Sequence, residues 1–235
     1  MSGERRVAIG VMARAPVAGT CKTRLAPLLG DEGAAALYAC MLRDTLDGLL
    51  AVPAARYVAL AAPVGDDTEI ARRDGATALA SHVFAPWEIV AQRGPDLGAR
   101  LRAGFEDLAF GHDTVVITST DSPTFPTEPL ADAIATLEDG EVLAGPCEDG
   151  GYYLIGARRP SPQVLDALFS DIPWSTSEVM SRTRERCAAV GAHIREVPTW
   201  YDVDEPADYT RLLDELRAFP DRAPRTAASL MIDRG

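Results

Sequence analysis

The chain has 235 residues, a formal net charge of −12 and a hydrophobic content of 47%, which suit one large or two small globular domains with a sizeable core. The acidic balance argues against a protein that coats nucleic acid, and no apolar run approaches the roughly 20 residues of a membrane helix. The four cysteines include no closely spaced pair and there are only three histidines, which disfavours both a structural zinc site and a disulfide framework. Scattered thiols suit a reducing compartment, so we expect a cytoplasmic protein.

A signal peptide is the competing interpretation of the first residues. Arg5 and Arg6 precede an apolar run, but the run is only as long as the shortest signal cores, and Arg14 interrupts the small-residue cleavage pattern. We expect this run, residues 7–13, to be a buried strand.

Apolar and amphipathic segments alternate along the rest of the chain. The expected strands cover residues 7–13, 56–62, 87–92, 114–120, 141–145, 151–156 and 193–198. The expected helices cover residues 31–50, a short segment from 66, and residues 96–108, 129–137, 164–169, 177–190 and 206–216. This alternation predicts an α/β fold in three layers with a mainly parallel sheet, as a single domain of residues 1–219 followed by a loose tail, 220–235.

Ligands of parallel α/β sheets bind at the carboxyl ends of the strands. The loops after Ala13, Thr120, Gly145 and Pro198 are therefore expected to share one crevice.

The first of these loops combines glycine with cations. It carries Arg14, Gly19, Lys22, Thr23 and Arg24. Glycine permits close backbone approach, and the following helix offers free N–H groups, so the loop suits a phosphate chain. The P-loop pattern itself fails, because a cysteine stands where its second glycine is required. The alternative is a solvated loop with two exposed cations.

Acidic residues follow two later strands. Asp121 ends a buried strand, where a carboxylate could hold Mg²⁺ against a triphosphate; the alternative is an Asx-type turn before Pro123. Asp202 and Asp204 share one face of an extended segment, so a divalent cation is a natural occupant between them. The alternatives are a solvated strand end or, for Asp204, a cap of the helix near Pro206.

Residues Glu148, Asp149, Gly150 and Gly151 form a polar turn between two expected strands. The turn is typical of a hairpin, and its glycines would also let the backbone approach a substrate. Taken together, cations in one loop and acids in later ones are the division of labour that nucleotidyl or phosphoryl transfer requires.

Several motifs carry a family resemblance. TRLAPL, from Thr23, resembles the end of the signature loop of sugar-phosphate nucleotidyltransferases. ARAPVAGTCKTRLAP, QRGPDLG, TDSP, GPCEDGGYYL, IPWST and YDVDEP resemble, in this order, bacterial glycosyltransferase A-like transferases. Those proteins are related to the guanylyltransferases that activate phospholactate or phosphoenolpyruvate. The likeness covers roughly residues 5–215.

This resemblance implies a Rossmann-like nucleotide-diphospho-sugar transferase (GT-A) fold and a bound Mg²⁺ or Mn²⁺. The implied catalytic residues are Lys22, Arg24 and Asp121, and the implied metal ligands are Asp121, Asp202 and Asp204. The implied nucleotide-binding residues are Arg14, Gly19, Thr23, Asp96 and Gly98, and the implied acceptor-binding residues are Glu148, Asp149, Gly150, Gly151 and Ser175. Relatives usually have lysine where this chain has Arg14, which keeps the charge but changes the donor geometry.

Three hypotheses follow. The first is a metal-dependent nucleotidyltransferase that moves an NMP from an NTP to a small phosphorylated acceptor. The second is a glycosyltransferase that uses an NDP-sugar; the second acid of the usual DxD motif is missing from Asp121-Ser122-Pro123. The third is a nucleotide-binding protein without catalytic activity. The expected ligands are thus an NTP or NDP-sugar and a small anionic acceptor; the sequence leaves the oligomeric state open.

Overall fold

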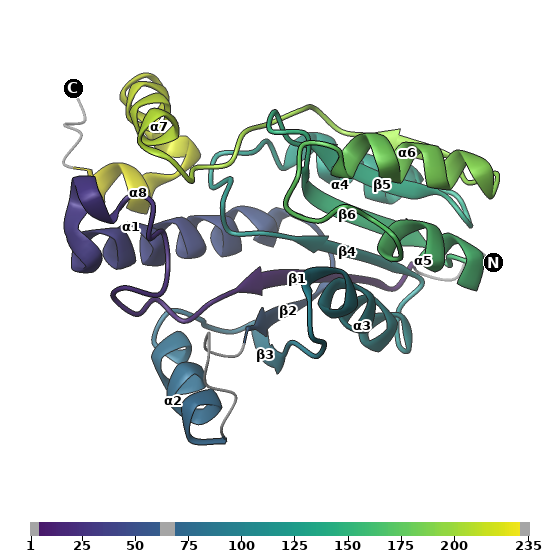
Figure 1. Cartoon of the computed structure of the whole chain (residues 1–235), viewed down its shortest axis with the longest axis horizontal. Helices are drawn as coiled ribbons and strands as arrows, with labels where there is room; N and C mark the ends of the chain where they lie inside the picture. The colour runs from purple at the N-terminus through teal and green to yellow at the C-terminus, as the bar shows by residue number, and fades with distance from the viewer. Residues whose placement is uncertain (1–4, 62–68, 231–235) are drawn as a thin grey trace.

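Seven strands form one mixed sheet in the computed structural model, which describes residues 5–61 and 69–230 (Figure 1). The strands are β1 Val7–Ala13, β2 Ala55–Leu60, β3 Trp87–Ala91, β4 Thr114–Thr118, β5 Val142–Pro146, β6 Tyr152–Arg158 and β7 Ile194–Glu196. Their order is β3-β2-β1-β4-β6-β5-β7, and β6 alone runs antiparallel to its neighbours. The prediction of a mainly parallel mixed sheet is confirmed.

Helices cover both faces of this sheet. They are α1 Ala26–Gly48, α2 Glu69–Ala80, α3 Leu97–Ala109, α4 Glu128–Thr136, α5 Pro162–Phe169, α6 Val179–Ala189, α7 Pro206–Ala218 and α8 Pro224–Ser229. The helix expected from residue 66 begins at Glu69, and residues 62–68 lie outside the described part of the chain. Within the described residues, no helix combines the length and apolar character of a membrane span.

The alternation of side chains along the strands separates two hydrophobic layers. In β4, Val116 packs with α1 and α4, while Val115 and Ile117 pack with α3, α5 and α6 on the opposite face. A helix on each face is what the predicted three-layer fold requires. The outer side of α1 also packs against α7 and α8 in a third cluster.

The first long helix differs from its predicted start. It was expected from Asp31, but its first turn begins at Ala26. Gly30, with φ of 72°, breaks the helical geometry between this turn and the main helix. Glycine adopts that conformation without strain, so the chain can turn sharply here after the cationic loop.

The prediction of a loose tail after residue 219 is wrong for the residues that the structure describes. Pro220–Arg222 form a 3₁₀ turn, and α8 packs on α1 with Thr226 fully buried. The carboxylate of Asp44 in α1 accepts hydrogen bonds from the backbone N–H groups of Arg225 (3.1 Å) and Thr226 (2.7 Å). This buried carboxylate satisfies two free N–H groups and so fixes the position at which α8 begins. The polar composition of the segment does not reveal such a long-range contact.

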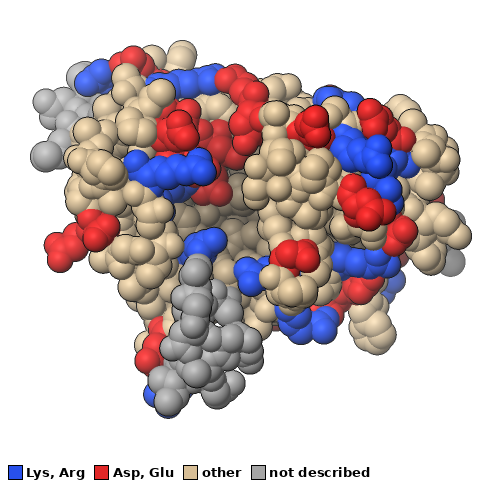
Figure 2. Space-filling view, in the orientation of Figure 1, with Lys and Arg blue, Asp and Glu red and all other residues tan. Residues whose placement is uncertain are grey.

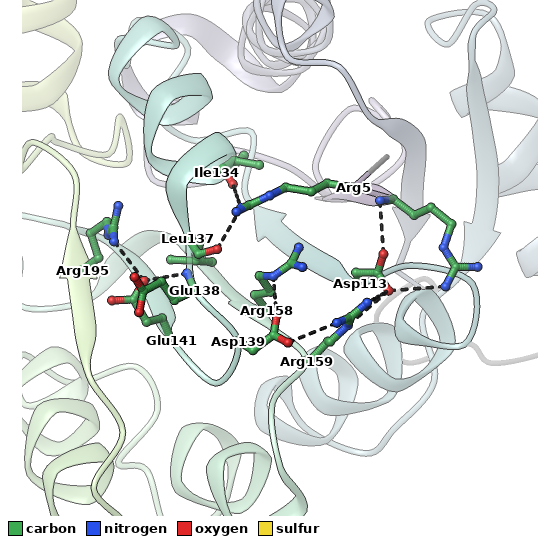
Figure 3. A network of polar contacts seen from close by, with 11 residues as sticks. Arg5, Asp113, Ile134, Leu137, Glu138, Asp139, Glu141, Arg158, Arg159 and Arg195 are labelled. Carbon is green, nitrogen blue, oxygen red and sulfur yellow. Dashed lines mark hydrogen bonds and ion pairs between the residues drawn. The ribbon is translucent and has the colours of Figure 1, made fainter. Parts of the chain in front are cut away.

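A network of ion pairs lies at the end of the sheet where β1 and β4 begin (Figure 3). Asp113 bonds both Arg6 (3.3 Å) and Arg159 (3.0 Å), and Arg159 reaches on to Asp139 (3.1 Å). Arg5 donates to the carbonyl oxygen of Leu137, after the end of α4, at 2.8 Å. These contacts join the beginnings of β1 and β4 to the end of β6. The predicted crevice lies at the other end of β1 and β4, where these strands end.

Candidate functional site

One cleft of about 750 Å³ opens at the carboxyl ends of β1 and β4. The β5–β6 hairpin and the segment before α7 also line it, so the four predicted loops do share one crevice. The predicted site residues in its lining are Arg14, Lys22, Thr23, Arg24, Asp121, Asp149, Gly151, Ser175, Asp202 and Asp204. Figure 2 shows this hollowed face with acidic and basic side chains gathered around it.

Lys22 is the most constrained cation in the cleft. Its backbone has φ of 47°, in the left-handed region, and its side chain is only 4% exposed. The Nζ atom donates to Oδ1 of Asp121 and, at 2.8 Å, to Oδ1 of Asp204. Burial opposes the charged form, but these two carboxylates raise the pKa of Lys22 well above its ordinary value. Lys22 is therefore a fixed ammonium ion in the protein's ground state.

Backbone and side-chain bonds hold the two acidic loops together. The N–H of Val203 donates to the carbonyl oxygen of Asp121 at 2.8 Å. The hydroxyl of Ser122 donates to Oδ1 of Asp202 at 2.5 Å. Burial, with the nearby charge of Asp121, raises the pKa of Asp202 to about 6. Asp121, Asp202 and Asp204, from two segments that are distant in sequence, thus form one acidic wall of the cleft.

Glu215 in α7 forms hydrogen bonds with both acidic loops, and the sequence analysis did not identify it. Its carboxylate accepts hydrogen bonds from the hydroxyls of Tyr201 and Thr124 (3.0 Å). Arg222 donates to the other oxygen at 2.6 Å. Tyr201 adjoins Asp202, so Glu215 links the C-terminal segment to the acidic wall. No sequence pattern pairs an α7 carboxylate with these hydroxyls.

Tyr38 in α1 is a second residue that the sequence reasoning missed. Its hydroxyl accepts hydrogen bonds from the N–H of Arg14 (2.9 Å) and from the hydroxyl of Thr120 (3.2 Å). Burial, with the charge of Asp121, raises the pKa of Tyr38 to about 12. The sequence did carry a signal for this residue, because the hydroxyl of Tyr38 lies on the otherwise apolar face of the helix predicted for residues 31–50.

Arg24 lies at the exposed rim of the cleft. It pairs with Glu205 at 3.4 Å, and both side chains are more than half exposed. Glu205 is also the N-cap residue of α7, so the suggested capping role of Asp204 is wrong. The chain extends before Pro206, and this frees Asp204 to bond Lys22.

Two further arginines line the cleft without a carboxylate partner in the described residues. Arg14 follows β1, and Arg100 in the first turn of α3 donates from Nε to the carbonyl oxygen of Gly94 at 3.0 Å. Arg100 was not among the predicted site residues. Both are available to an anionic ligand.

Asp96 and Gly98 serve α3 itself and do not line the cleft. The carboxylate of Asp96 caps α3 by accepting from the N–H of Ala99 at 2.8 Å. Gly98 lies beneath the ring of Trp174, where an added Cβ would be 2.3 Å from the indole nitrogen. Trp174 does line the cleft, so Gly98 affects its shape through this contact. Nucleotide contacts at these two positions stay predictions.

Three other predicted residues are also outside the cleft lining. Glu148 pairs with Arg211 of α7 at 2.5 Å. Gly150 has φ of 91°, and an added Cβ would lie 2.1 Å from the carbonyl oxygen of Ser177, so only glycine fits this hairpin turn. Gly19, with φ of 75°, turns the cationic loop. Their ligand contacts likewise stay predictions.

The acidic wall offers few ligands of its own to a divalent metal ion. Within the described residues there is no group of three or more His, Cys, Asp or Glu side chains arranged to hold one. Asp121 and Asp204 nevertheless converge on a single cation, the ammonium of Lys22. Mg²⁺ is commonly bound by one or two carboxylates together with substrate phosphates. These residues therefore fit an ion whose other coordination positions are filled by water or by a phosphate ligand.

The sequence profile of a bacterial family, described as "Uncharacterized protein conserved in bacteria (DUF2064)", matches residues 50–176. A search of curated proteins gave no match. The crystal structure of a proposed nucleotide-diphospho-sugar transferase from Desulfovibrio desulfuricans G20 is similar at 28% identity and a TM-score of 0.83, covering 97% of this chain and 95% of that one.

More distant structures share the fold alone. A nucleotidyl transferase from Methanothermobacter thermautotrophicus has 17% identity and a TM-score of 0.61, over 92% of this chain and 100% of that one. A cytidylyltransferase from Leptospira borgpetersenii has 14% identity and a TM-score of 0.57, over 97% and 94%. The fold implied by the family resemblance, that of the GT-A-type transferases, is confirmed.

Proposed function

The chain belongs to the DUF2064 family, and we propose that it is a metal-dependent nucleotidyltransferase, acting in the cytoplasm. It would move an NMP from an NTP to a small phosphorylated acceptor. An oxygen of the acceptor attacks the α-phosphorus of the NTP, the bond from that phosphorus to the bridging oxygen breaks, and pyrophosphate leaves. The single-domain organisation of the chain and the site roles below are part of this proposal.

The observation that carries the proposal is the contact of Lys22 with Asp121 and Asp204 inside the cleft. Nucleotidyl transfer builds negative charge on the α-phosphate and the leaving pyrophosphate. A buried ammonium stabilises such charge far more than an exposed one, because little water screens it. Glycosyl transfer from an NDP-sugar does not require a cationic loop directed at a triphosphate.

Each predicted site residue then has a proposed task. Lys22 would bind the phosphates, with Arg14, Thr23 and Arg24 orienting the triphosphate from the rim. Asp121 and Asp204 would hold the metal ion, with Asp202 beside them. When bound, Mg²⁺ or Mn²⁺ neutralises charge on the phosphate oxygens. The acceptor-binding set is proposed to be Glu148, Asp149, Gly150, Gly151 and Ser175, and the remaining nucleotide-binding residues are Gly19, Asp96 and Gly98.

The test is a thermal-shift panel followed by a pyrophosphate-release assay. The panel holds ATP, GTP, CTP, UTP and the common NDP-sugars, each with and without Mg²⁺ or Mn²⁺. A ligand at about 100 times its Kd adds roughly 2.7 kcal/mol of stability, so a metal-dependent shift with one NTP is expected. That NTP is then assayed with phosphorylated acids as acceptors.

Variants of the site check the assigned roles. Lys22→Ala and Asp121→Ala should each reduce pyrophosphate release at least a hundredfold, by analogy with the loss of one group that stabilises transition-state charge. Asp214→Ala is the control, because this exposed α7 carboxylate lies outside the cleft and pairs with Arg217. Unchanged release in both site variants would show that the roles are assigned wrongly.

Glycosyl transfer is the second candidate, favoured by the similarity to the proposed nucleotide-diphospho-sugar transferase from Desulfovibrio. Asp121 would then serve the metal-bound diphosphate. A thermal shift with an NDP-sugar and none with any NTP would support this alternative. Sugar transfer without pyrophosphate release would establish it.

A further inference from the structure

We propose that Lys22 has a second role, as the resident counter-ion of Asp121 and Asp204, and that a divalent cation displaces its ammonium from them. The inference rests on the metal site of the proposed function. It differs from that function because it concerns the protein without nucleotide. In this state Lys22 would compete with the metal ion for the same carboxylate oxygens.

The contacts of Lys22 place its two roles in competition for the same N–H donors. Its Nζ atom bonds Oδ1 of Asp121 and Oδ1 of Asp204, and the side chain is 4% exposed. An ammonium has three donors and no more, and two of them are directed at carboxylates. At most one donor is therefore left for a phosphate until the ammonium leaves these partners.

The charges explain why a counter-ion is needed at rest. Four carboxylates, of Asp121, Asp149, Asp202 and Asp204, line the same cleft. Asp202 accepts a hydrogen bond from Ser122, and no cation among the described residues pairs with it. Without Lys22, Asp121 and Asp204 would face each other uncompensated in a partly buried site, which is costly. Lys22 thus maintains the arrangement of the acids until a stronger cation arrives.

The choice of residue type fits an exchange. Among the 23 lysines and arginines of the chain, Lys22 is the single lysine. Lysine places a compact charge on a flexible four-carbon stem, whereas the planar fork of arginine binds carboxylates in a fixed bidentate geometry. The stem lets the ammonium swing from the acids toward a phosphate in the same cleft while the backbone stays in place.

The first experiment measures binding of Mn²⁺ alone, without nucleotide, by the electron paramagnetic resonance signal of the free ion. Lys22→Met keeps the stem and removes the charge, so it should bind Mn²⁺ about tenfold more tightly than wild type, since a unit charge within about 4 Å of the ion is lost. Lys22→Arg should bind no more tightly than wild type. Arg217→Met is the control: it removes an exposed cation that pairs with Asp214 in α7, and it should change the affinity less than twofold.

A second experiment uses the wild-type chain, so it does not depend on how a variant folds. Because Lys22 is the single lysine, it and the α-amino group are the two amine targets of an amine-acylating reagent, and intact mass counts the stable labels. Lys22 should be protected in EDTA and become labelled when Mg²⁺ alone is added. The α-amino group, labelled equally in both conditions, is the internal standard.

The outcomes separate this inference from the proposed function. If Lys22→Met binds Mn²⁺ no more tightly than wild type, or Lys22 stays protected at saturating Mg²⁺, the displacement is refuted while pyrophosphate release can still establish the transferase. If Asp204→Asn and wild type bind Mn²⁺ equally, Asp204 is no ligand and the displacement is refuted as well. Tighter binding by Lys22→Met with metal-dependent labelling supports the exchange even if no NTP is turned over.

Discussion

Replacing Asp202 by asparagine should stabilise the metal-free protein near neutral pH. Burial, aided by the charge of Asp121, raises the pKa of Asp202 to about 6. The folded protein must therefore hold a carboxylate whose charge it disfavours. Asparagine has a similar shape, and its carbonyl oxygen can still accept the hydrogen bond that Ser122 donates to Asp202.

The sign and size follow from proton linkage. The unfolded chain releases this proton near its ordinary value of 3.8, whereas the folded chain holds it up to about pH 6. Between these values the folded state binds more protons, so the free energy of unfolding falls as the pH rises and stays lower above pH 6. The difference corresponds to roughly 3 kcal/mol at most. Asp202→Asn should thus gain about 2–3 kcal/mol at neutral pH, or roughly 4–12 °C in Tm for a chain of this size.

Urea unfolding of both proteins in EDTA, from pH 4 to pH 8, measures this gain. The advantage of Asp202→Asn should grow between pH 4 and pH 6 and then level off. The control is Asp214→Asn, which also removes one negative charge but in an exposed pair with Arg217, and it should stay within about 0.5 kcal/mol of wild type. Equal or lower stability of Asp202→Asn at pH 7.5 would refute the assignment of a buried, disfavoured charge.

Two structural predictions concern the wall of the cleft and the C-terminal segment. Gly98→Ala places a Cβ 2.3 Å from the indole nitrogen of Trp174, so it should cost about 1–3 kcal/mol and shift tryptophan fluorescence; Gly111→Ala, with no atom within 4 Å, should do neither. Asp44→Ala leaves two N–H groups at the start of α8 without their acceptor. It should cost about 2–4 kcal/mol and speed proteolysis of α8, whereas Asp47→Ala, which removes one exposed ion pair, should cost under about 1 kcal/mol in urea unfolding.

The sequence by itself determined the elements and the loops that meet. Apolar runs such as residues 114–120 report a buried strand through local composition, and the alternation with amphipathic helices restricts the sheet to a mainly parallel one. Because parallel strands end on the same side of a sheet, the positions of Lys22, Asp121 and Asp202 in the segments that follow expected strands are enough to assign their loops to one crevice. These inferences need only neighbouring residues and a general rule of topology.

Tertiary structure decided which side chains meet within that crevice. Lys22 bonds Asp204, which is 182 positions away in the sequence, and Glu148 pairs with Arg211. Glu215 bonds residues of two loops, and no sequence pattern connects it to them. The supposed tail packs because a buried carboxylate in α1 meets its free N–H groups. Such pairings depend on the distances between elements and on burial, which together set the energy of interaction between charged groups. The order of residues records only which residues are adjacent along the chain.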